Sequence, residues 1–133
     1  MSVEAAQLYA ELDRLASSVF IPGGHYLFRC GDPVSGVYTI RRGAVKMELQ
    51  NASHVYPPRT LGPGEIVGLP ATLTGSYSLS ALLAEDSELG FIPAARMSEL
   101  LETSPRLCLL ATRTISGEVA RMRAVLKTAP LEV

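Results

Sequence analysis

The chain has 133 residues, of which 47% are hydrophobic and 19% charged, and its formal net charge is -1. This length allows one domain with a single core and excludes a multi-domain mechanism within the chain. The composition is that of a globular protein rather than a disordered or fibrous one. The charge balance lacks the strong basic bias of dedicated nucleic-acid binders.

Cysteine usage and the absence of long apolar runs bear on the compartment. Cys30 and Cys108 are too few for a disulfide framework and lack the CxxC spacing of a zinc or redox site. We expect two buried thiols in a reducing environment. No apolar run is long enough to span a bilayer, and the first residues are acidic where a signal peptide would be basic. The sequence therefore predicts a cytoplasmic protein with no membrane partner.

Residues 2–17 predict a short amphipathic helix at the N-terminus. Apolar residues recur there at steps of three and four, as one helical face requires: Ala5, Leu8, Leu12 and Leu15. Ser2 stands where a helix cap is expected, and Glu4 lies near the positive end of the helix dipole.

Residues 18–93 contain about eight short apolar or β-branched runs separated by glycine, proline and asparagine. The clearest run is Val45 to Gln50, in which apolar and polar residues alternate as in a half-buried antiparallel strand. Turn residues at such regular intervals are typical of an all-β sandwich or barrel.

Residues 94–102 and 104–127 predict two further helices. Ser104 is a good helix cap and Pro105 a good first helical residue, and no further proline follows before Lys127. At 1.5 Å per residue the second helix would be roughly 34 Å long, which is more than the β region needs.

The long helix carries the apolar stripe of a coiled coil over nearly three heptads. Its members are Cys108, Thr112, Ile115, Val119, Met122 and Leu126. We expect a homodimer through this helix; the alternative is an ordinary helix that lies on its own β domain. From Pro105 to Lys127, five basic residues less one acidic residue give +4, which leaves -5 for the rest of the chain. This asymmetry fits an acidic protein partner, nucleic acid or the solvated flanks of a coiled coil.

Four sequence segments together carry a resemblance to a known family. They are Gly31-Asp32, the run Gly36 to Val45, the run Leu61 to Gly68, and Leu101 to Pro105. With the order of the predicted elements, they resemble the cyclic nucleotide-binding domain of the catabolite activator (Crp/Fnr) type of bacterial regulator. The resemblance implies an α+β, mainly β fold: an eight-stranded jelly-roll β-barrel with a short N-terminal and a long C-terminal helix. Residues 1–133 would then be a single cyclic nucleotide-binding-like domain.

The resemblance also implies where a ligand would bind. In that family, a short helix after a strand that ends in glycine holds the phosphate, a glutamate holds the ribose hydroxyl and an arginine neutralises the phosphate. Here Leu69 stands at the glutamate position and Leu79 at the arginine position, while the serine that follows the arginine is retained as Ser80. The family's base-reading threonine and serine fall on Met122 and Arg123. The implied pocket is degenerate and consists of Gly68, Leu69, Pro70, Ala71, Thr72, Leu79, Ser80 and Ala81.

Two functions remain open. Losing two charge-assisted hydrogen bonds lowers affinity by about 10² to 10⁴, so we expect a non-catalytic sensor or regulatory module whose usual nucleotide contacts are lost and which needs no cofactor. Leu69 and Leu79 would then line a site for a neutral ligand or belong to the core. The alternative is a genuine receptor domain for cyclic AMP or cyclic GMP, from a Crp/Fnr-type regulator without its DNA-binding domain. Since only residues 128–133 follow the long helix, no direct DNA binding is expected, and a protein partner stays open.

The sequence offers no case for an enzyme. His25 and His54 lie in different runs without a partner at metal-ligand spacing, and we expect both on the surface with no metal site. No GxSxG, P-loop, HExxH or Cys-His pattern is present, and no catalytic residue is predicted.

Overall fold

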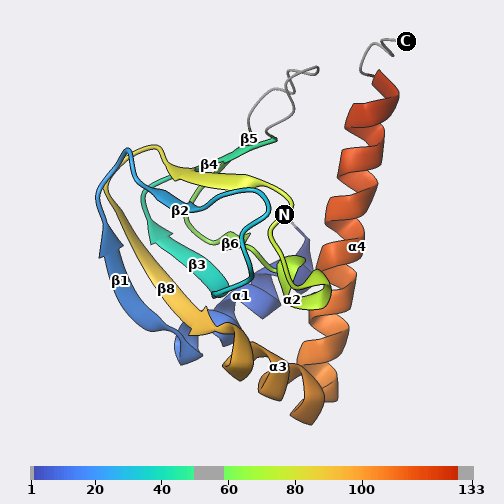
Figure 1. The fold of residues 1–133 in the computed structure, drawn as a ribbon. Helices are drawn as coiled ribbons and strands as arrows, with labels where there is room; N and C mark the ends of the chain where they lie inside the picture. The colour runs from blue at the N-terminus through green and yellow to red at the C-terminus, as the bar shows by residue number, and fades with distance from the viewer. Residues whose placement is uncertain (1, 50–58, 129–133) are drawn as a thin grey trace.

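The structure is a computed structural model that describes residues 2–49 and 59–128, without the side chains of residues 118, 119 and 121–128. The described strands form two four-stranded antiparallel sheets (Figure 1). The first sheet has the order β1 (Ser17–Ile21), β8 (Ser87–Pro93), β3 (Gly36–Arg42) and β6 (Ile66–Val67). The second has the order β2 (Tyr26–Phe28), β7 (Ser80–Leu83), β4 (Val45–Glu48) and β5 (Arg59–Leu61).

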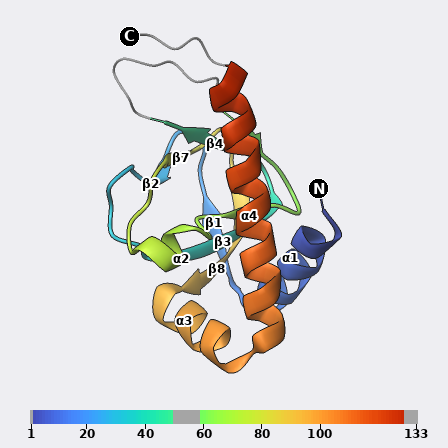
Figure 2. The same cartoon turned by 90° about the vertical axis from the view of Figure 1, so that its right-hand side faces the viewer.

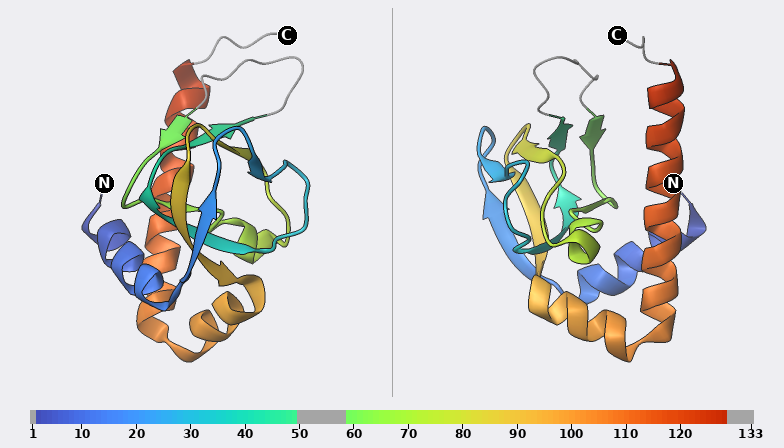
Figure 3. Two further views of the ribbon diagram at one scale, coloured as in Figure 1. Left: turned by 90° about the vertical axis from the view of Figure 1, so that its left-hand side faces the viewer. Right: turned by 45° about the vertical axis from the view of Figure 1, so that its right-hand side comes forward.

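Helices flank these sheets in the described chain. They are α1 (Val3–Leu15), α2 (Ala71–Thr74), α3 (Ala94–Thr103) and α4 (Pro105–Thr128). The Ser2 side chain accepts a hydrogen bond from the Ala5 amide at 3.1 Å, so α1 begins at the cap that its sequence predicts. Both α1 and α3 pack against the N-terminal part of α4, which then runs on past the edge of the sheets (Figures 2 and 3).

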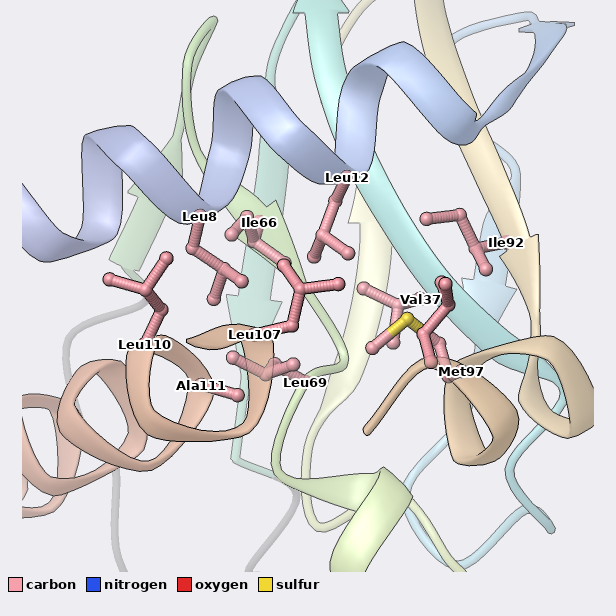
Figure 4. Packing of buried hydrophobic residues seen from close by; sticks show 11 residues of the cluster. Leu8, Leu12, Val37, Ile66, Leu69, Ile92, Met97, Leu107, Leu110 and Ala111 are labelled. Atoms are coloured by element: carbon pink, nitrogen blue, oxygen red, sulfur yellow. The ribbon is translucent and has the colours of Figure 1, made fainter. Parts of the chain in front are cut away.

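The core has two parts. One lies between the two sheets and includes Phe28, Ile40, Val45, Leu83 and Leu89; we call it the inter-sheet core. The other lies where α1, α3 and α4 cover the first sheet, and we call it the helical core. Its residues include Leu8, Leu12, Val37, Ile92, Met97, Leu107, Leu110 and Ala111 (Figure 4).

A polar network fixes α1 to the first sheet. The Asp13 carboxylate accepts hydrogen bonds from Thr39 Oγ1 at 2.7 Å and from Arg41 Nε at 2.8 Å. The hydrogen bond to Asp13 raises the pKa of Arg41. Tyr9 donates to the carbonyl of Ile40 at 2.8 Å, and burial raises the pKa of Tyr9. These bonds couple the orientation of α1 to β3 because all the partners outside α1 lie on that strand.

Two ion pairs join α1 to α4. Arg106 pairs with Glu11, and Arg113 Nη1 lies 3.9 Å from Glu4 Oε1. The arginines are more than half exposed, so these pairs contribute little to stability and mainly favour one relative orientation of the two helices.

The α+β class, the antiparallel strands and the N-terminal helix are confirmed. The strands are divided between two sheets, and closure into a barrel stays a prediction. The prediction that both thiols are buried is wrong, because Cys30 and Cys108 are exposed. Cys30 follows β2 in a turn, and Cys108 lies on α4 beside Leu107, whose side chain is the one that packs inward.

Candidate functional site

The implied pocket is built around a short helix that follows a strand ending in glycine. Strand β6 ends at Val67, and Gly68 has φ +86°, a conformation that favours glycine. Pro70 then precedes α2, in which Thr72 Oγ1 donates to the carbonyl of Leu69 at 2.7 Å. The chain leaves α2 through Gly75, again with positive φ. These features agree with the local geometry that the resemblance implies.

The residues at the two charged positions of the family lie in different surroundings. Leu69 is only 1% exposed and belongs to the helical core, where it lies near Leu107 and Ala111 of α4 (Figure 4). Leu79 is half-buried just before β7. The predicted pocket residues are therefore not all together: Leu69 packs with the helices, while Ala71 and Ala81 belong to the inter-sheet core.

Sequence reasoning missed the largest side chain of this region, Tyr77. It is 3% exposed, and its ring stacks on that of Phe28 with centroids 3.5 Å apart and planes 5° from parallel. A Cβ atom on Gly68 would lie 3.0 Å from Cε1 of Tyr77, so this glycine leaves room for the ring. One signal was available: Tyr77 is an isolated aromatic residue in the polar run Gly75 to Ser78.

The backbone around Tyr77 is joined to the turn after β2. The Tyr77 amide donates to the Asp32 carbonyl at 3.0 Å, and the Gly31 amide donates to the Tyr77 carbonyl at 2.8 Å. The Val34 amide donates to the Gly75 carbonyl at 2.9 Å. Backbone hydrogen bonds with residues 31–34 thus hold Gly75 and Tyr77, which lie in the segment between α2 and β7.

The retained serine already has a partner within the chain. Ser80 is fully buried, and its Oγ accepts a hydrogen bond from the Cys30 amide at 2.9 Å. The Cys30 thiol in turn donates to the carbonyl of Ser78 at 3.4 Å. Ser80 therefore serves the pairing of β7 with the β2 turn in this structure.

The described interior contains no cation. Among the described residues, the buried polar side chains are Thr39, Ser80 and Ser87, and none of them is charged. Two exposed arginines have contacts within the chain: Arg59 pairs with Glu65 at 3.5 Å, and the guanidinium of Arg29 lies 4.0 Å from the centroid of the Tyr26 ring. Of the side chains that the structure describes, no positive one is buried between the sheets, where a phosphate would need one.

The structure tests the other predicted sites only in part. His25 is exposed, as expected, and His54 lies outside the described residues. Within residues 2–49 and 59–128, no three His, Cys, Asp or Glu side chains are grouped as a metal site requires. No helix in the described part of the chain is long and apolar enough to cross a membrane.

The stripe on α4 is described over its N-terminal half. Cys108 and Thr112 are exposed, and Ile115 is half-buried against the helical core. The side chains of the other three stripe residues, Val119, Met122 and Leu126, lie outside the described residues.

Comparison with known proteins decides the family. The family model described as cyclic nucleotide-binding domain matches residues 18–104. The chain belongs to this family. Its sequence is 35% identical over 97 residues to the transcriptional activator protein anr of Pseudomonas aeruginosa, covering 72% of this chain and 40% of that protein. It is 31% identical over 120 residues to the transcriptional regulatory protein btr of Bordetella pertussis, covering 89% of this chain and 50% of that protein.

Among solved structures, the cyclic nucleotide-binding fold recurs in the catabolite activator protein of Thermus thermophilus. That structure matches with a TM-score of 0.73 and 23% identity, and the match covers 96% of this chain and 59% of the other. The family model and the two related regulators confirm the resemblance to Crp/Fnr-type regulators, and the solved structure shows the same fold. The chain spans about half the length of the regulators it matches, so their activities as whole proteins remain proposals for this chain.

Proposed function

We propose that residues 1–133 form one non-catalytic regulatory domain of the cyclic nucleotide-binding type, which has lost the usual nucleotide contacts and acts as a homodimer. The observation that carries this proposal is that apolar and aromatic side chains of the chain itself fill the implied nucleotide pocket. Leu69 packs in the helical core, and Tyr77 occupies the space beside Gly68. Neither leucine at a family contact position can bond a ribose hydroxyl or a phosphate.

The energetic argument concerns the phosphate charge. A cyclic nucleotide carries a negative charge that must lose water to enter the inter-sheet core. Burying a charge without a partner costs several kcal/mol in a protein interior. Because no described charged side chain is buried, no side-chain charge in the described core offsets that cost.

Thermal unfolding in the presence of cyclic AMP or cyclic GMP tests the loss of binding. A ligand at about 100 times its dissociation constant stabilises a protein by about 2.7 kcal/mol, which raises the midpoint by several degrees. We expect no shift at millimolar nucleotide beyond that caused by 5′-AMP, which serves as the control. A saturable shift specific to the cyclic form would overturn the proposal.

A second candidate function is a genuine cyclic nucleotide receptor. Two observations favour it: the short helix α2 follows Gly68 as in the family, and Ser80 is retained. In this case both nucleotides, or one of them, raise the unfolding midpoint of the wild type. The effect should weaken in Ser80→Ala, because the remaining hydroxyl contact is removed. The thermal shift thus separates the two candidates.

Dimerisation through α4 is supported by the two faces of this helix, one buried against the domain and one exposed to solvent. Leu107, Leu110 and Ala111 pack inward, while Cys108 and Thr112 of the stripe face solvent. Coiled-coil partners pack on such a stripe. We expect light scattering to give twice the monomer mass at micromolar concentration.

A matched pair of variants locates the interface. Thr112→Glu places a charge on the stripe and should shift the equilibrium toward the monomer. Ala120→Glu places the same charge on an exposed position of α4 on the outer side of the heptad and should not. A wild-type monomer, or equal effects of the two substitutions, would contradict dimerisation through this stripe.

A further inference from the structure

Tyr77 is held as a bound molecule would be held. Its ring lies parallel to that of Phe28, whereas the Tyr38 ring is tilted by 34° to Phe28 with centroids 6.5 Å apart. Parallel stacking on an aromatic side chain is a common way for proteins to hold a planar group. Gly68 lies at the edge of this stack, since a Cβ there would come 3.0 Å from Cε1 of Tyr77 and 3.6 Å from Cε2 of Phe28.

The phenol oxygen has its own set of partners, which all come from the start of β3. It accepts hydrogen bonds from the Ser35 amide at 3.1 Å and the Gly36 amide at 3.2 Å, and donates to the Gly36 carbonyl at 2.8 Å. Ser35 Oγ lies 3.0 Å from it. Two donors and one acceptor from the backbone therefore converge on one hydroxyl oxygen in a buried position.

We propose that the space between Phe28, Gly68 and Ser35-Gly36 is a binding site for a planar aromatic group that carries a hydroxyl, and that Tyr77 is its built-in occupant. The site takes a free aromatic hydroxyl compound when the Tyr77 ring is absent from it. This inference rests on the proposed function and deepens it, because Tyr77 fills interior space beside the positions at which the usual nucleotide contacts are lost.

The backbone of residue 77 does not depend on the ring. Its amide and carbonyl bond to Asp32 and Gly31, and the neighbouring Val34–Gly75 bond is also between backbone atoms. Pro33 and Ser76 form an isolated β-bridge in the same place. Removing the ring therefore leaves these bonds available and opens a cavity lined by one aromatic face and three hydrogen-bonding groups.

Replacing Tyr77 by alanine and adding 4-methylphenol, which is the lost side chain as a free molecule, tests the proposal. We expect Tyr77→Ala to unfold at a lower temperature than the wild type and to regain several degrees in a saturable way with the phenol. Tyr9→Ala is the matched control, because it loses the same side chain from a half-buried position with one hydrogen bond. Wild type and Tyr9→Ala should show only the small, non-saturating effect of the solvent additive.

Two measurements keep the test decisive. If Tyr77→Ala is unfolded alone, 4-methylphenol should restore the far-ultraviolet circular dichroism of the folded chain, and failure to do so overturns the proposal. Tyr77→Phe keeps the ring, so it should lose stability without gaining any response to the phenol. A folded Tyr77→Ala that responds no more than Tyr9→Ala also overturns it. Because none of these experiments contains a cyclic nucleotide, their failure is distinguishable from failure of the proposed function.

Discussion

Restoring the glutamate of the family at position 69 should strongly destabilise the protein rather than create a binding site. Leu69 is 1% exposed in the helical core, and losing a buried leucine costs about 2 to 3 kcal/mol. A carboxyl in that position must stay protonated at neutral pH. An ordinary glutamate pKa is about 4.3, so holding the proton at pH 7 costs about 3.7 kcal/mol. The sum is about 6 kcal/mol, against a total stability of about 5 to 15 kcal/mol for a domain of this kind.

Urea unfolding followed by circular dichroism measures this loss. Leu73→Glu is the matched control, because Leu73 is 68% exposed on the neighbouring short helix and the change there should cost less than about 0.5 kcal/mol. The folded-state pKa of the new carboxyl is raised, so the deficit of Leu69→Glu should be largest at neutral pH and shrink as the pH falls toward about 4. Equal midpoints for the two variants would refute the assignment of Leu69 to the core.

Three further outcomes follow from the fold. Asp13→Ala leaves the fully buried hydroxyl of Thr39 without its partner and breaks the bond to Arg41. The free energy of unfolding, measured by urea unfolding, should therefore fall by about 2 to 3 kcal/mol, and a change below about 0.5 kcal/mol would contradict the role of this network. Burial raises the pKa of Tyr38 above its ordinary value of 10.0, so the folded state holds that proton more tightly, and the free energy of unfolding should fall as the pH rises above 10. In Tyr38→Phe the free energy of unfolding should fall less over the same pH range, and an equal fall in both proteins would count against this cause. Gly36→Ala would bring a Cβ within 2.2 Å of the Ile92 carbonyl and should prevent folding, whereas a wild-type melting temperature would contradict the close approach of β3 and β8.

The class of the fold could be predicted because its signals are local. Alternation of apolar and polar residues from Val45 marked β4, and Ser2 and Ser104 stand where α1 and α4 begin. The short helix after Gly68 was expected only from the family resemblance, and the structure has it as α2.

The distribution of side chains between the two cores could not be predicted from the sequence. Leu69 is apolar in either surrounding, and only the packing of α4 over the first sheet decides that it joins the helical core. Tyr77 stands among polar residues, which resembles an exposed loop until the turn at Gly31 is brought against it. Cys30 and Cys108 were assigned to the interior from the general behaviour of free thiols, but their surroundings depend on the turn after β2 and on the rotation of α4.

The central claim is that the usual nucleotide contacts are lost, and a nuclear magnetic resonance titration tests it most directly. Amide signals of Gly68, Thr72, Ser80 and Ala81 report on the implied pocket even when binding is weak. We expect no saturable shift of these signals with cyclic AMP or cyclic GMP up to millimolar concentration, because the described interior offers no cation and Tyr77 fills the space beside Gly68. Saturable shifts that cluster on these amides, with either nucleotide, would contradict the account.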